Sequence, residues 1–270
     1  MLYALARWQE IELTFVQVES ITEQHGAAAD RALYYASRVI AALRRDRYVI
    51  SDVTLSDARK GLDITQKMGE LSLFTQAHFI VGWILVLRGA LDEAEEPLRA
   101  SLAFSEQIGY PLYQAWALTW LTVLFRRRGL VDKVRHYAAR ALEIAASGGI
   151  PEQEAMAHAN LAWVAWREGD HDQVRELART AFAAWQRGQW IYAFHWTARL
   201  PLLALSLDRN QISDALEHAQ ALLDPQQQKL PEKLEAALET AVQAGEAQQA
   251  KQVSTYLQRA VALAQETGFL

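Results

Sequence analysis

The nine residues 86–94, VLRGALDEA, carry a pattern that returns as FRRRGLVDKV around Gly129 and as WREGDHDQV around Gly169. The central glycines of these phrases lie 40 residues apart. A second set follows at gaps of 40, 40 and 39, namely Gly69, Gly109, Gly149 and Gly188. Glycine ends a helix readily because it adopts the left-handed backbone conformation without a Cβ clash. Between these marks apolar residues recur three and four apart, so the sequence predicts a solenoid of helix pairs.

The same periodicity places helices along the rest of the chain. Two helical patterns run over 2–25 and 28–47, and Ser56 and Asp57 can cap a third that ends at Met68. Regular helices are expected at 71–88, 91–107, 111–128, 131–147, 151–168 and 171–187. A weaker unit takes 190–208 and 211–223, with Asn210 in the turn, and a last pair takes 231–244 and 246–266 around Gly245.

Prolines and aspartates mark particular points in these helices. Pro111 and Pro151 fall in first turns, where the missing N–H costs nothing. Acidic residues after the turn glycines can satisfy free N–H groups, and they are Asp92, Asp132 and Asp170. Pro201 should kink its helix, because the carbonyl four residues back loses its donor. We divide the chain into N-terminal helices at 1–53, repeats at 54–228, and a terminal helix pair of the same array at 229–270.

Composition excludes several classes of function. Hydrophobic residues make up 51% of the 270, the formal net charge is −5, and there is no cysteine. An acidic chain has no general attraction for nucleic acid, and without thiols it has no disulfide framework or thiolate metal site. No run approaches the roughly 18 apolar residues of a membrane span, and MLYALARW is too short for a signal peptide. We expect no membrane partner, no direct nucleic-acid partner and a cytoplasmic location.

The positions of small residues resemble those of the tetratricopeptide repeat. Five, nine and twelve residues after each turn residue come Ala94, Val134, Val174 and Ala215, then Leu98, Ala138, Ala178 and Ala219, then Ser101, Ala141, Ala181 and Leu222. Seven residues before it come Gly82, Thr122, Ala162 and Leu203. The period near 40 instead of 34, and the lack of a consistent Trp in the first helix, depart from that family. The resemblance implies an all-α, right-handed superhelix of antiparallel helix pairs, with about 40 residues per repeat.

Longer-period arrays of this type are found at the carboxyl end of large bacterial signalling ATPases that carry a nucleotide cyclase or DNA-binding domain. The phrases LTWLTVLFRRRG, AHANLAWVAWREGD and ALAQETGFL are similar in style to such arrays. The resemblance covers roughly residues 54–270 and suggests that this chain is a segment of a larger signalling protein. The catalytic motifs of such proteins are absent from this sequence.

No motif for catalysis, a metal or a cofactor appears. The phosphate loop, the dinucleotide glycine turn, H-E-x-x-H and the G-x-S-x-G elbow are all missing. His78 and His158 share a register but lie two units apart, so they should be ~20 Å or more from each other, and packed core histidines explain them better than a metal. The clustered acids Glu93, Glu95 and Glu96 read as a solvated helix face. We therefore expect no catalytic residue, no metal and no cofactor.

Aromatic and basic residues define the candidate binding surface. The first helix of each unit lines the inner curve of a tetratricopeptide solenoid, and eight residues fall on that register: Phe79, Trp83, Trp116, Arg126, Arg127, Trp163, Trp166 and Arg167. Trp and Arg are the residue types enriched at binding hot spots. For each Trp taken singly, filling the core is the competing explanation. The set as a whole supports a concave groove as strongly as it supports a core.

The predicted function is a non-catalytic protein-interaction or regulatory module. Its partner would be a peptide or domain with acidic residues that pair with arginine. The alternatives are an enzyme with a dispersed active site in the groove and a module that binds a small-molecule inducer. A terminal helix could also mediate homo-oligomers. Since solenoid contacts are between neighbours, truncation after Gln228 should cost the remaining repeats little.

Overall fold

The computed structural model describes residues 8–188 and 192–270, which fold into α-helices without any strand. The chain divides into two compact units, one up to Trp120 and one from Leu121 onward. The expected helix start at residue 2 and the expected start of another helix at 190 lie outside the described residues. The all-α class and the succession of helices are confirmed.

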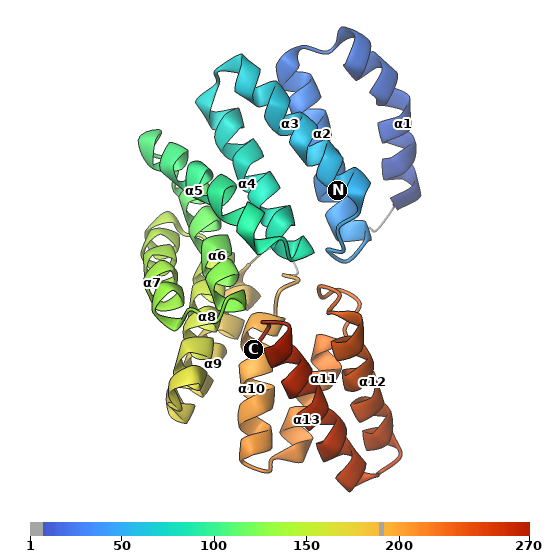
Figure 1. Ribbon diagram of the computed structural model, residues 1–270, viewed down its shortest axis with the longest axis vertical. Coiled ribbons are helices and arrows are strands. Elements are labelled where there is room, and N and C mark those ends of the chain that lie inside the picture. The colour runs from blue at the N-terminus through green and yellow to red at the C-terminus, as the bar shows by residue number, and fades with distance from the viewer. Residues whose placement is uncertain (1–7, 189–191) are drawn as a thin grey trace. The chain divides into compact units, whose positions relative to one another are not determined.

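Unit 1 consists of five helices and the first part of a sixth (Figure 1). They are α1 (Trp8–His25), α2 (Ala28–Arg45), α3 (Asp52–Met68), α4 (Leu71–Arg88), α5 (Leu91–Gln107) and α6 (Pro111–Arg127), the last of which continues into unit 2. From α1 to α5 each helix packs on the next along the chain, and α2 also contacts α4. Neighbouring helices fold back on each other because the turns between them are short.

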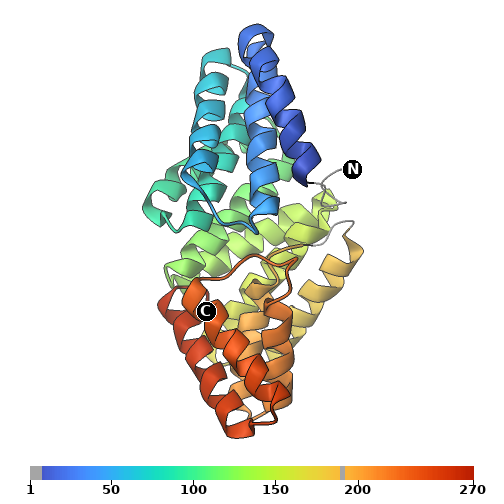
Figure 2. The ribbon, with the colours of Figure 1, turned by 90° about the vertical axis from the view of Figure 1, so that its right-hand side faces the viewer.

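Unit 2 holds the end of α6 and seven further helices (Figure 2). They are α7 (Val131–Gly148), α8 (Pro151–Glu168), α9 (His171–Arg187), α10 (Trp196–Asp208), α11 (Ile212–Leu222), α12 (Glu232–Glu246) and α13 (Ala250–Glu266). Here the packing is not limited to successive helices. Helix α10 contacts α8, α9, α11 and α13, and α11 contacts both α12 and α13. Its core therefore joins elements that are distant in the sequence.

The turn residues behave largely as the sequence predicts. Six of the glycines have positive φ, namely Gly69, Gly89, Gly109, Gly129, Gly149 and Gly169, and Asn210 follows at φ 55°. Gly188 does not, because its φ is −66° and the chain leaves α9 in an extended conformation. The turn expected at Gly245 is also wrong. Gly245 lies inside α12 against Leu216 of α11, and the left-handed residue is Gln248 at φ 57°.

The caps follow the prediction only in part. Pro111 and Pro151 begin α6 and α8, and Asp170 caps α9 by accepting a hydrogen bond from the Gln173 N–H at 3.1 Å. Helix α3 begins earlier than expected, and its cap is Ser51, which accepts from the Thr54 N–H at 3.1 Å. Asp57 is instead a buried residue of α3. Asp92 and Asp132 are first-turn residues, where a negative charge is favoured by the helix dipole.

Small residues permit close approach between helices. At Gly82 of α4, an added Cβ would lie 2.6 Å from Cγ and 3.0 Å from the backbone N of Leu98 in α5. Ala162, at the matching position of α8, has no exposed surface. These contacts confirm that the positions seven residues before a turn are small for steric reasons.

Helix α4 is long and apolar enough to cross a membrane when judged by length and composition alone. This helix is the one exception, among the described residues, to the expectation of no spanning segment. Half of this 18-residue apolar stretch, Leu71–Arg88, is buried inside the protein, and α4 packs against neighbours such as α5. Core helices of water-soluble proteins satisfy the same test, so α4 is weak support for a membrane segment.

Candidate functional site

The eight predicted binding residues fall into both units and differ in exposure. Phe79, Arg126 and Trp163 are buried in the core. Trp83, Trp116, Arg127 and Trp166 are half-buried, and Arg167 is exposed. The expectation that all eight line a surface is therefore wrong for the three buried residues. Their large apolar or stacked side chains are removed from water by helices that the sequence register did not place beside them.

In unit 1 the three predicted residues Phe79, Trp83 and Trp116 form a continuous group with Tyr48 and Tyr113, which the sequence prediction did not include, and we call these five residues the aromatic ledge. Phe79 of α4 lies at its centre. Its ring centroid is 5.7 Å from that of Trp83, 5.3 Å from that of Trp116 and 5.9 Å from that of Tyr113. Tyr48 reaches the ring of Trp83 at 6.1 Å. The buried Phe79 thus supports two half-exposed indole rings from below.

Two further residues extend the ledge, and the sequence prediction missed both. Tyr110, whose side chain is 39% exposed, packs edge-on against Tyr113 at 5.1 Å. At the other end, burial raises the pKa of Tyr48, and the positive charge of Arg44 opposes this rise. Arg44 is exposed, so its guanidinium is a surface cation close to the ledge. The sequence feature that could have indicated this cation is the basic run 44–47, although the helix dipole alone explains basic residues at the end of a helix.

In unit 2 the predicted binding residue Arg126 is a buried hydrogen-bond donor and not part of a surface. Arg126 is 1% exposed and donates hydrogen bonds to the Asn160 side-chain oxygen at 3.3 Å, the Thr197 carbonyl at 2.7 Å and the Phe269 carbonyl at 2.8 Å. Its guanidinium also lies 5.5 Å from the Trp163 ring and 4.9 Å from the Trp196 ring. No carboxylate of the described residues pairs with it. Burial lowers the pKa of Arg126 well below its ordinary value, and only carbonyl dipoles and ring faces offset that cost.

The three remaining predicted residues also lie in unit 2. Arg167 stacks over the Trp163 ring at 5.1 Å, and Trp166 packs against a cluster formed by Ala165, Val174 and Leu205. Arg127 lies over the Phe269 ring at 4.8 Å. Of these three, only Arg167 keeps an exposed side chain.

A wide groove crosses α9, α10 and α11 in unit 2. It has a volume of about 710 Å³ and a floor that includes Leu202 and Leu205. Its polar rim carries both signs of charge, from Arg175, Arg209, Asp214, Glu217 and His218. Burial, followed by the charge of Arg199, lowers the pKa of His218. The His218 Nδ1 is 3.4 Å from an Arg199 guanidinium nitrogen. The size is within the range of small-molecule sites.

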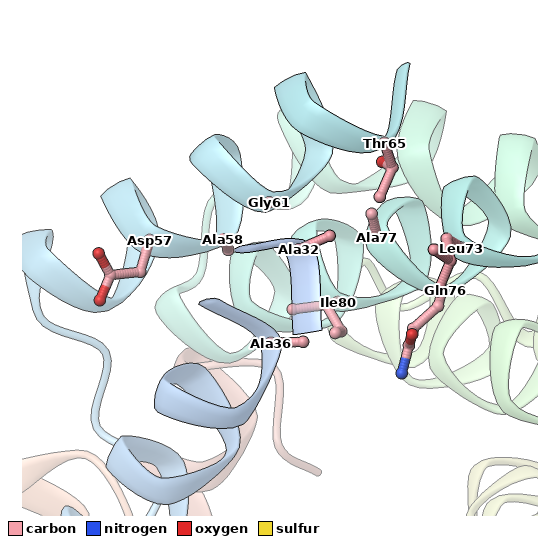
Figure 3. A pocket seen from close by; sticks show the side chains of 10 residues that line it. All are labelled: Ala32, Ala36, Asp57, Ala58, Gly61, Thr65, Leu73, Gln76, Ala77 and Ile80. Atoms are coloured by element: carbon pink, nitrogen blue, oxygen red, sulfur yellow. The ribbon is translucent and has the colours of Figure 1, made fainter. Parts of the chain in front are cut away.

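A smaller cavity lies between α2, α3 and α4 in unit 1 (Figure 3). Its volume is about 20 Å³, which is enough for one water molecule. Figure 3 shows the Asp57 carboxylate turned away from the small side chains Ala32, Ala58 and Ala77. That carboxylate pairs with Arg38 at 3.1 Å. This cavity is a packing gap and not a ligand site.

The histidines show no arrangement suited to a metal. His78 packs on the rings of Phe74 at 4.3 Å and Phe104 at 5.6 Å, and burial lowers its pKa. The pKa of His158, in the other unit, is also lowered by burial. Among the described residues, no group of three metal-ligating side chains is close enough to hold an ion.

Comparison with known proteins gives information about the fold of this chain and not about its function. No protein-family model and no curated protein sequence matches this chain. The crystal structure of BtubC (BKLC) from P. vanneervenii is similar, with a TM-score of 0.57 and 16% identical residues. The match covers 81% of this chain and 89% of that chain. Together with the succession of helices, it supports an all-helical, repeat-like solenoid.

Proposed function

We propose that this chain is a non-catalytic protein-interaction module that binds a partner peptide or domain on the aromatic ledge of unit 1. In this proposal its helix pairs are tetratricopeptide-like repeats of about 40 residues in a right-handed superhelix. The module would be cytoplasmic and would belong to a larger bacterial signalling protein. The glycine spacing and the close helix contacts support the repeat.

The half-exposed pair of indole rings, Trp83 and Trp116, carries the proposal. Both rings rest on the buried Phe79, so little conformational freedom remains for a ligand to remove. Rigid aromatic side chains offer large contact area at low entropic cost. An apolar anchor of the partner would lie on these rings, and an acidic residue beside it would pair with Arg44. Arg44 therefore takes the role that the sequence prediction gave to the arginines Arg126, Arg127 and Arg167.

The test is a pull-down followed by affinity measurements on the captured partner. Trp83→Ala and Trp116→Ala should each weaken binding by about 2 kcal/mol if they are hot spots. Arg44→Ala should weaken it mainly at low salt. Phe74→Ala is the matched control, because Phe74 is a half-buried ring on the same helix α4 in a separate cluster with His78 and Phe104. Equal losses for Phe74→Ala and Trp83→Ala would point to damaged folding and not to a binding surface.

A second candidate function rests on the groove across α9, α10 and α11. Its mixed charges over an apolar floor suit a small polar or zwitterionic ligand, as an inducer-binding module requires. The dispersed-site enzyme remains the alternative for the same groove, since Glu217 and His218 both line it. Thermal-shift screening with amino acids and dipeptides tests binding. Arg209→Met should abolish any shift, whereas Arg187→Met, which removes a surface pair with Glu154, should not.

A further inference from the structure

The four residues that follow α13 form a turn that closes the end of this helix and packs against unit 2. The backbone turns at Gly268, whose φ is 74°. The amides of Phe269 and Leu270 then both donate to the Ala264 carbonyl, at 2.8 and 3.0 Å. The side chains of Phe269 and Leu270 are only 4% and 5% exposed. The segment 267–270 is thus buried against the protein although it is not helical.

The surface that receives this segment is built from three side chains, Arg126, Arg127 and Trp196, which we call the socket. Arg126 donates to the Phe269 carbonyl at 2.8 Å, and Arg127 reaches the Thr267 carbonyl at 3.5 Å. The Phe269 ring lies between the Arg127 guanidinium at 4.8 Å and the Trp196 ring at 4.7 Å. The socket therefore binds main-chain carbonyls and one aromatic side chain.

Hydrogen bonds to the main chain and a pocket for one side chain are also the contacts by which receptors bind peptides. The present occupant also leaves part of the socket unused. The Nε–H of Arg126 is buried without a hydrogen-bond partner among the described residues. A buried donor in that state is unfavourable, so a ligand with one more acceptor would bind better than the segment does.

We propose that the socket is a second peptide-binding site, which residues 267–270 occupy as an internal competitor. Its external ligand is a partner peptide with a glycine–aromatic–aliphatic sequence that turns at the glycine, as the segment does at Gly268. That peptide must displace the internal segment, which lowers its apparent affinity by the fraction of molecules in which the socket is open. The site lies in unit 2 and does not depend on the aromatic ledge of unit 1.

Gly268 gives a way to empty the socket without altering it. A Cβ at this position would lie 2.5 Å from the Arg127 carbonyl oxygen and 3.1 Å from its Cα, both backbone atoms that cannot move aside. Gly268→Ala therefore expels the segment while Arg126, Arg127 and Trp196 stay in place. The matched control is Gly149→Ala, because Gly149 has a similar φ of 64° but nothing within 4 Å of an added Cβ.

The probe is the acetylated and amidated peptide Thr-Gly-Phe-Leu carrying a fluorophore, titrated against each full-length protein by anisotropy. Gly268→Ala should bind it at least tenfold more tightly than the parent and Gly149→Ala. Adding Arg127→Ala to Gly268→Ala should remove that gain. A Gly268→Ala protein that keeps its helical circular dichroism but binds no better than Gly149→Ala would overturn the proposal.

If Gly268→Ala does not fold, hydrogen exchange on the parent protein tests the proposal instead. An internal competitor opens locally, so the amides of Phe269 and Leu270 should exchange at least tenfold faster than that of buried Leu257 in α13. Exchange of all three amides at one rate would mean that the segment leaves only when unit 2 unfolds, and the proposal would fail. Neither result bears on Trp83 or Trp116, so the two binding proposals stand or fall separately.

Discussion

The carbonyl oxygen of Thr197 connects two residues that would each be unfavourable alone. Pro201 has no N–H, so the Thr197 carbonyl four residues earlier has no helical donor. Arg126 is a buried cation without a carboxylate, and it donates to this same oxygen at 2.7 Å. The lost donor at Pro201 was predictable from the sequence, whereas the residue that replaces it was not.

This arrangement predicts a coupling between positions 126 and 201. Arg126→Met removes the donor to Thr197, and Pro201→Ala supplies a backbone N–H that can take its place. We expect Arg126→Met to cost about 1 kcal/mol less in the Pro201→Ala background than alone. Chemical denaturation of the parent, both single variants and the double variant measures this. Additive effects would show that Arg126 does not substitute for the missing helical donor.

His195 predicts a dependence of stability on pH. Burial, followed by the charge of Arg199, lowers the pKa of His195 from 6.5 to about 4. Between these values the unfolded chain binds more protons than the folded protein, so stability is full above pH 6.5 and falls as pH drops toward 4. We expect about 2–3 kcal/mol to be lost over that range through this residue.

The measurement compares urea denaturation at pH 7 and pH 4.5 for two variants. His195→Phe should flatten the pH dependence of the free energy of unfolding, because the ring stays apolar at both pH values. His136→Phe is the matched control for the same substitution at an exposed histidine, and the slope of His195→Phe is compared with its slope. A parent-like slope in His195→Phe would assign the acid sensitivity to other groups.

Two glycines inside helices predict opposite effects at the scale of the element. Gly82→Ala would force α4 and α5 apart at Leu98 and should cost about 1–3 kcal/mol. Gly61→Ala places its Cβ 3.6 Å from the Tyr35 Cβ, an ordinary contact beside the small cavity of Figure 3. The gain in helix propensity should then stabilise the protein by about 0.5–1 kcal/mol. Thermal melts of the pair test this, and equal shifts would contradict the close packing of α4 on α5.

The helix pair α12–α13 corrects a prediction made from neighbour contacts. Truncation after Gln228 was expected to cost the rest of the array little. In the structure, such a truncation would remove Phe269 from Arg126 and α13 from α10. Arg126 would keep only its bonds to Asn160 and Thr197. The loss should therefore be large in unit 2, because a buried guanidinium is left with fewer acceptors.

At the scale of the whole molecule, the two units should differ in local stability. Helix α1 has one buried apolar side chain, Ile11, while Leu13, Val16 and Ile21 are at least 60% exposed. Unit 2 instead joins distant segments through Arg126. We expect amides of α1 to exchange with solvent well before those of α8 and α10 in native-state hydrogen exchange. Equal protection of α1 and α8 would mean that something covers the outer face of α1.

The sequence was most informative where structure depends on local residues. Helix limits and left-handed turns follow from spacing and from glycine, so most of them were predicted well. The failures have non-local causes. Gly245 is small because Leu216 lies against it and not because a turn is needed, and Ser51 caps α3 in place of Ser56. The predicted residues Phe79, Trp83 and Trp116 do lie together, but the burial of Arg126 depends on partners far along the chain.

The hydrogen bond between Arg126 and Phe269 joins residues that are 143 positions apart in the sequence. It therefore forms long after Arg126 has been synthesised. At ~5–20 residues per second, a ribosome needs roughly 7–30 s to reach the second residue after making the first. During that interval the Arg126 guanidinium lacks one of its three acceptors, and the Trp196 ring lacks the Phe269 ring that packs on it. A nascent chain stalled in this window would present a basic, aromatic surface that the finished protein hides. Chaperones and proteases could use that surface to distinguish a chain that lacks Phe269 from one that contains it.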